Sequence, residues 1–78
     1  MAKVRSFSEG TQSVKAHPTE VDCCYQIVTT DDGSKLLHLT TFGSDERQSK
    51  PKSSQSIQID EAGALELMQV IRAAFNFE

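Results

Sequence analysis

Residues 35–42 read KLLHLTTF, and this stretch decides the fold together with the residues after it, up to the helix that opens at Asp60. Apolar and polar side chains alternate at its centre, which predicts a β-strand. A polar segment comes next at 44–54, and the alternation returns in QSIQI at 55–59. Asp60 is a good N-cap residue, so a helix is predicted to open there. This order of strand, loop, strand and helix predicts an α+β domain.

A partner strand is predicted at residues 21–28, ahead of the turn sequence DDG at 31–33. A two-residue loop would put Ile27 opposite His38. A three-residue loop, with its glycine left-handed in a bulge, would put Ile27 opposite Leu37. The second register collects the apolar side chains on one face, so we predict it. The other face of the hairpin is then mixed polar and aromatic, with Gln26, Val28, Leu36, His38, Thr40 and Phe42.

After Asp60, apolar residues recur at helical spacing and form one stripe: Ala64, Leu67, Met68, Ile71, Ala74 and Phe75. The stripe predicts a helix of about four turns that covers the apolar face of the sheet. Leu65 and Val70 lie off the stripe and form a second apolar edge of the helix, which would be exposed to water in a monomer. A chain this short also has a small core. We therefore expect a homodimer, with Leu65, Val70 and Ile71 at its interface. The expected fold is an antiparallel twisted sheet of about four strands followed by one C-terminal amphipathic helix.

The first 20 residues have few apolar side chains, and we expect an arm or a weakly packed first strand around 3–8, ahead of a domain at 21–78. No stretch is apolar enough for a signal peptide or a membrane span. Cys23 and Cys24 are adjacent, which is the wrong geometry for an ordinary disulfide. These features predict a reduced, cytoplasmic protein.

The formal net charge is −3, but the charges are unevenly distributed. Seven of the eight basic residues precede position 53, whereas the helical end is acidic. Three of these cations, Arg47, Lys50 and Lys52, lie in a loop rich in hydroxyl and amide groups that can bind phosphate oxygens. The alternative is a solvent-exposed loop without a ligand, in which the charges of Asp45 and Glu46 offset those of two of the cations.

Metal and catalytic sites have weaker support in the sequence. Zinc sites need spaced ligands, and the adjacent Cys23 and Cys24 cannot both turn to one ion from a regular strand. We expect Cys23 to be a small core residue and His38 a surface residue. No recognisable motif supplies a third group that would orient a Cys-His nucleophile. The four glycines are isolated from one another, so they do not form a glycine-rich phosphate-binding loop. We expect no metal, no cofactor and no enzymatic activity.

Over residues 24–75 the pattern resembles the C-terminal domain of the transcriptional coactivator called positive cofactor four. The features that carry the resemblance are the strand KLLHLTTF, the Lys-Pro-Lys sequence at 50–52 before Ile57-Gln58-Ile59, and a helix capped at Asp60 directly after that strand. The resemblance implies a dimeric module that binds single strands. It also implies that Lys50 and Lys52 contact the backbone, that Phe42 stacks on a base, and that Leu67 and Ile71 pack.

We therefore expect a protein that binds single-stranded DNA or RNA, with DNA favoured over RNA, and with little sequence preference. The expected contact residues are Lys35, His38, Phe42, Arg47, Lys50 and Lys52. The alternative is an interaction or accessory-subunit module of the same fold that binds a protein partner. Salt separates the two, because binding to phosphates weakens steeply as salt is added, whereas an apolar interface does not weaken in this way.

Overall fold

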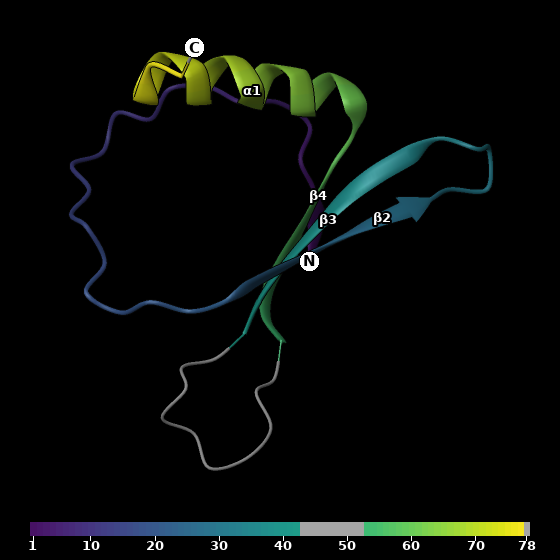
Figure 1. Cartoon of the computed structure of the whole chain (residues 1–78), viewed down its shortest axis with the longest axis horizontal. Helices are drawn as coiled ribbons and strands as arrows, with labels where there is room; N and C mark the ends of the chain where they lie inside the picture. The colour runs from purple at the N-terminus through teal and green to yellow at the C-terminus, as the bar shows by residue number, and fades with distance from the viewer. Residues whose placement is uncertain (43–52, 78) are drawn as a thin grey trace.

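The computed structural model describes residues 1–42 and 53–77, which form one four-stranded sheet and one helix (Figure 1). The elements are β1 (Ala2–Lys3), β2 (Cys23–Thr29), β3 (Lys35–Phe42), β4 (Ser53–Ile59) and α1 (Glu61–Phe75). The strand order is β1-β4-β3-β2. β3 pairs antiparallel with both β2 and β4, whereas β1 pairs parallel with β4. The predicted α+β class is confirmed, and β1 makes the sheet mixed.

The hairpin between β2 and β3 has the predicted three-residue loop. Ile27 lies opposite Leu37, and Gly33 has a φ of +88°. The turn is closed by two backbone hydrogen bonds, from Thr30 N–H to the Ser34 carbonyl at 2.8 Å and from Gly33 N–H to the Thr30 carbonyl at 3.0 Å. This register gives the sheet one apolar face, on which Tyr25, Leu39 and Ile57 form one row and Ile27, Leu37 and Ile59 form the next.

Helix α1 begins and ends at well-formed caps. The Asp60 carboxylate accepts a hydrogen bond from Gly63 N–H at 2.8 Å, as expected of an N-cap aspartate. At the other end Asn76 is left-handed, with a φ of 54°, and its N–H donates to the Arg72 carbonyl at 2.9 Å. This is a left-handed C-cap with asparagine in the place of the usual glycine.

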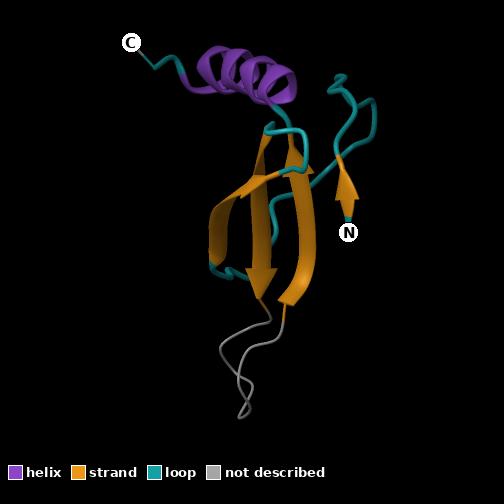
Figure 2. Cartoon of the chain, turned by 90° about the vertical axis from the view of Figure 1, so that its right-hand side faces the viewer, coloured by secondary structure: helices purple, strands orange, loops and turns teal. Residues whose placement is uncertain are grey.

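The position of α1 differs from the sequence prediction, because the helix does not cover the apolar face of the sheet. Figures 1 and 2 show α1 beyond the end of the sheet, away from most of the strands. A methyl group at Gly63 would lie 3.0 Å from Ile59 Cγ2, so the first turn packs on that residue, which is 1% exposed. Tyr25 and Ile27 remain 74% and 61% exposed. The cause is the connection: Asp60 alone joins β4 to α1, so no loop returns the helix over the strands.

The folded chain is open for its size. Its radius of gyration is 15.0 Å, whereas a compact chain of this length would have about 11.5 Å. Its accessible surface is 7431 Å², against about 4,700 Å² for a typical folded monomer of this mass. Among the described residues, Ile59 is the one large side chain that is fully buried. A single copy therefore leaves most of its apolar side chains in water.

The N-terminal arm joins the two edges of the sheet. The predicted first strand around 3–8 is shorter and earlier, at Ala2–Lys3, and Val4 N–H extends the pairing by donating to the Gln58 carbonyl at 2.8 Å. Residues 4–22 contain no helix or strand and pass beside α1 before they reach β2 (Figure 1). Phe7 lies near the first turn of α1, because a methyl group at Gly63 would be 3.7 Å from its Cε2.

We predict that Gly33→Ala destabilises the protein by about 1 kcal/mol or more, because an L-residue disfavours the left-handed conformation at this position. Gly10→Ala is the control: both glycines face open space, and only Gly33 has positive φ. Urea unfolding of the two variants measures the difference. Equal stabilities would show that the turn does not hold Gly33 in this conformation.

Candidate nucleic-acid interface

A row of polar residues crosses all four strands on the face opposite the apolar one. Lys3 of β1 lies beside Gln58 of β4, Gln58 lies opposite His38 of β3, and His38 lies opposite Gln26 of β2. The next row contains Cys24, Thr40 and Ser56. We call this surface the polar face, and its polar side chains are Lys3, Gln26, His38, Thr40, Ser56 and Gln58.

The imidazole of His38 is held from both sides. Its Nε2 lies 2.7 Å from Thr40 Oγ1, and its Nδ1 lies 3.1 Å from Gln58 Nε2. The Gln58 amide nitrogen can only donate, so Nδ1 accepts and the ring proton lies on Nε2, which donates to the Thr40 hydroxyl oxygen. Thr40 is buried, and this bond satisfies its side chain. The three residues therefore form one connected network across β3 and β4.

A shallow cavity of about 210 Å³ opens on the polar face beside this network. Ser56 is short, and its larger neighbours His38 and Gln58 stand next to it along the strands. The cavity is lined by Met1, Ala2, Lys3, His38, Ser56 and Gln58. It offers an amide, a hydroxyl, an imidazole and an ammonium group within one small volume.

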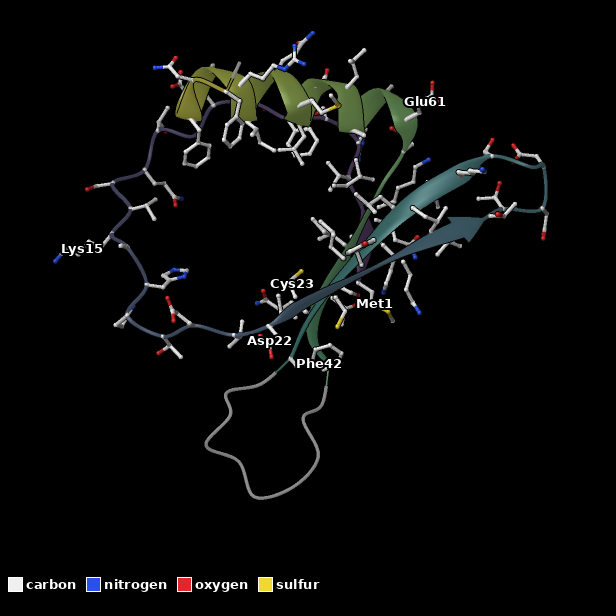
Figure 3. All side chains as sticks on the ribbon, viewed as in Figure 1. Met1, Lys15, Asp22, Cys23, Phe42 and Glu61 are labelled. Carbon is white, nitrogen blue, oxygen red and sulfur yellow. The ribbon has the colours of Figure 1, made fainter. Side chains whose placement is uncertain are left out.

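The predicted contact residues are only partly brought together. His38 lies at the centre of the polar face, and Phe42 ends β3 after a register shift, with its N–H donating to the Asp22 carbonyl at 3.3 Å. Figure 3 labels Phe42 and Asp22 at this end of the sheet. Lys35 begins the same strand, about 23 Å from Phe42, and lies on the apolar face together with Leu37. Arg47, Lys50 and Lys52 lie outside the described residues.

Three residues of the polar row were not among the predicted contact residues, for different reasons. The predicted hairpin register already placed Gln26 on the face of His38, but it was not chosen as a contact residue. Gln58 alternates with Ile57 and Ile59, but no register was predicted for its strand, so its position opposite His38 was not expected. Lys3 gave no such signal. It reaches the row through a parallel pairing between β1 and β4, segments more than fifty residues apart in the chain.

A larger cavity, about 840 Å³, lies between the hairpin turn and the start of α1 and is mainly acidic. Its charged lining residues are Lys3, Asp31, Asp32, Lys35, Asp60 and Glu61. Four carboxylates against two ammonium groups make this cavity unfavourable for phosphate. Across residues 1–42 and 53–77, no group of three or more potential ligands is placed to hold a metal ion.

The residues predicted at a dimer interface differ in exposure. Leu65 and Val70 are 58% and 54% exposed, whereas Ile71 is half-buried within the chain. Val70 also lines an apolar cavity of about 490 Å³ between the N-terminal arm and α1, together with Phe7 and Ala74. The second apolar edge of the helix is therefore open in a single copy, as the sequence predicted.

Comparison with protein-family models, curated proteins and solved structures found no match to this chain. The resemblance to the coactivator family therefore stays a prediction from sequence. In the described part of the chain, α1 is the one helix, and it is neither long nor apolar enough to cross a membrane.

The Asp32 carboxyl makes the stability of the β2–β3 turn depend on pH. Hydrogen bonds from the Thr30 hydroxyl and then from Ser34 N–H lower the pKa of Asp32 from 3.8 to about 2. Because the pKa is lower in the folded state, this stabilisation is complete above about pH 4 and is lost as the pH falls toward 2.

We predict that Asp32→Asn loses less stability than the wild type between pH 4 and pH 2. Asp31→Asn is the control, since among the described residues the Asp31 side chain makes no hydrogen bond. Thermal melting at several pH values measures the difference. Identical pH profiles for wild type and Asp32→Asn would contradict the prediction.

Proposed function

We propose that this protein binds single-stranded nucleic acid, DNA in preference to RNA and with little sequence specificity, on the polar face of its sheet. The observation that carries the proposal is the polar row of Lys3, Gln58, His38 and Gln26, which crosses four strands opposite an apolar face. Such a face offers hydrogen-bond donors to phosphate and sugar oxygens without a fixed sequence requirement.

Phe42 and the basic segment at 43–52 would extend this surface at one end. The chain leaves β3 at Phe42 and enters β4 at Ser53, and the cations Arg47, Lys50 and Lys52 lie between these two positions in the sequence. Single-strand binding commonly combines cations that follow the backbone with an aromatic ring that stacks on a base. Phe42 is half-buried, which leaves part of its ring available.

The charge distribution supports this choice of face despite the net charge of −3. Asp31, Asp32 and Glu61 lie around the turn and the start of α1, at the opposite end of β3 from Phe42. A strand bound near Phe42 would therefore lie away from these carboxylates, whereas Asp60 pairs with Lys3 at the other end of the polar face. Contacts between cations and phosphates weaken as salt is added, so we expect the tightest binding at low salt.

We propose that the binding unit is a homodimer. The accessible surface exceeds that of a typical folded monomer by about 2,700 Å². A standard interface buries about 800 Å² per partner, so the excess is more than sufficient for one. The apolar sheet face and the exposed side of α1 offer complementary apolar surfaces, and a helix of one copy packed on the sheet of the other would bury both. The polar face lies on the other side of the sheet and would stay accessible.

The same apolar surface favours a second candidate function, a module that binds a different protein. In that case a heterologous partner would cover Tyr25, Ile27 and Ile57, and the polar face would have no ligand. Binding would then depend weakly on salt, because apolar burial releases no condensed counterions. Affinity for oligonucleotides separates the two functions.

We predict that Phe42→Ala weakens binding to a single-stranded oligonucleotide about 10- to 100-fold with little change in salt slope, since stacking is worth about 1–3 kcal/mol per base. Phe77→Ala is the control, because Phe77 is an exposed aromatic beyond α1.

Replacing Lys50 and Lys52 by Ala should flatten the salt slope by about one unit for each phosphate that is no longer neutralised. Fluorescence anisotropy at several salt concentrations measures both effects. No binding of any single strand by the wild type at low salt would reject the function and favour a protein partner.

We predict that sedimentation at micromolar concentration gives a dimer and that Ile27→Asp dissociates or unfolds it, because a charge would be buried in the apolar interface. Gln26→Asp is the matched control: it adds the same charge to the same strand on the opposite face and should leave the dimer intact. A monomeric wild type, or an Ile27→Asp variant that remains dimeric, would overturn this assembly.

A further inference from the structure

We propose that the cavity on the polar face receives one unpaired base, with adenine preferred, and that Gln58 reads its edge. The inference rests on the proposed function and adds a ligand to one position of the bound strand. Single strands are the appropriate substrate, because their unpaired bases expose edges that a duplex conceals.

The cavity has the size and position for one base. Its volume is about 210 Å³, below the roughly 300 Å³ at which pockets for whole drug-sized ligands begin. The short side chain of Ser56 leaves the space, while His38 and Gln58 stand beside it. A base placed there would lie over Ser56 with its edge against the Gln58 amide.

The amide of Gln58 is oriented before any base arrives. One of its N–H groups donates to His38 Nδ1 at 3.1 Å, and the ring is fixed in turn by Thr40 Oγ1 at 2.7 Å. The amide oxygen and the second N–H have no partner among the described residues and remain available as neighbouring acceptor and donor. A glutamine amide commonly pairs with adenine, by accepting from N6 and donating to N7.

Lys3 supplies the charge at the rim of the cavity. Its ammonium group lies 3.8 Å from Asp60 Oδ2, with the Lys3 side chain 57% exposed. An exposed ion pair this long is weak, so the side chain can turn to a phosphate at little cost. The phosphate next to the bound base would therefore have a cation within reach, contributed by β1.

His38 is a positioning residue in this arrangement. It does not need to touch the base, because its role is to hold the Gln58 amide in one orientation. Its replacement should therefore reduce discrimination between bases while the charge contacts and the salt slope stay the same.

The test compares twelve-residue single strands of dA, dC and dT at low salt by fluorescence anisotropy. We expect the wild type to bind dA about tenfold more tightly than dT, within the discrimination of about 1–3 kcal/mol given by one bidentate contact. Gln58→Ala should bring the two affinities together with an unchanged salt slope. Gln55→Ala is the matched control, since Gln55 lies on the same strand and alternates onto the other face, and it should keep the preference.

Two further variants test the cavity and the network. Ser56→Leu fills the space and should lower dA affinity to the level of dT, while His38→Leu should lose the preference because Gln58 loses its fixed partner. Melting temperatures show that each variant is folded. Equal wild-type affinity for the three strands, or a preference that survives both Gln58→Ala and Ser56→Leu, overturns the base site alone. An unchanged ratio in His38→Leu overturns the positioning role. A wild type that binds none of the strands overturns the proposed function itself.

Discussion

The register of the β2–β3 hairpin is the constraint on which the other features of the sheet depend. Side chains alternate between faces with a period of two, so a slip of one residue would exchange the faces of one strand relative to the next. With Ile27 opposite Leu37, the two apolar rows share one face, and His38 lies opposite Gln26 and Gln58 on the other. The register of a two-residue loop would put Ile27 opposite His38, so that apolar and polar side chains would be mixed on both faces. The left-handed Gly33 belongs to the three-residue turn that sets this register between β2 and β3.

The apolar face of the sheet leaves large side chains exposed to water in a single chain, Tyr25, Ile27 and Ile57 among them. One residue, Asp60, connects β4 to α1, so the helix leaves from the end of the sheet and buries Ile59 but not Tyr25 or Ile27. Ordering the backbone costs about 1–2 kcal/mol per residue, and in the described part of the chain Ile59 is the one large side chain that is fully buried, so apolar burial offsets only part of that cost. The physical consequence we propose is that folding and association are coupled, so that stability depends on protein concentration.

The sequence predicted the local features and missed those that depend on distant pairing. The strand at 35–42, the three-residue turn and the cap at Asp60 each follow from neighbouring residues, and all three are confirmed. The position of α1 depends on the short connection and on what covers the sheet, which helical periodicity does not reveal. Lys3 could not be assigned to the polar row, because a two-residue parallel strand has no periodic pattern to detect. Lys35 and His38 were both predicted as contact residues, although alternation along β3 puts them on opposite faces.

The N-terminal arm connects the two faces of the sheet, which gives a role to a segment with little regular structure. Lys3 belongs to the polar row, while Val4 next to it is half-buried and extends the pairing through Gln58. Phe7 then lies near Gly63 above Ile59, on the apolar side. Packing of Phe7 against the start of α1 thus helps to hold β1 beside β4, and so keeps Lys3 at the rim of the cavity. In the homodimer that we propose, the exposed side of the same helix packs on a second copy, so association on one face would also stabilise the strand that supplies the cation on the other.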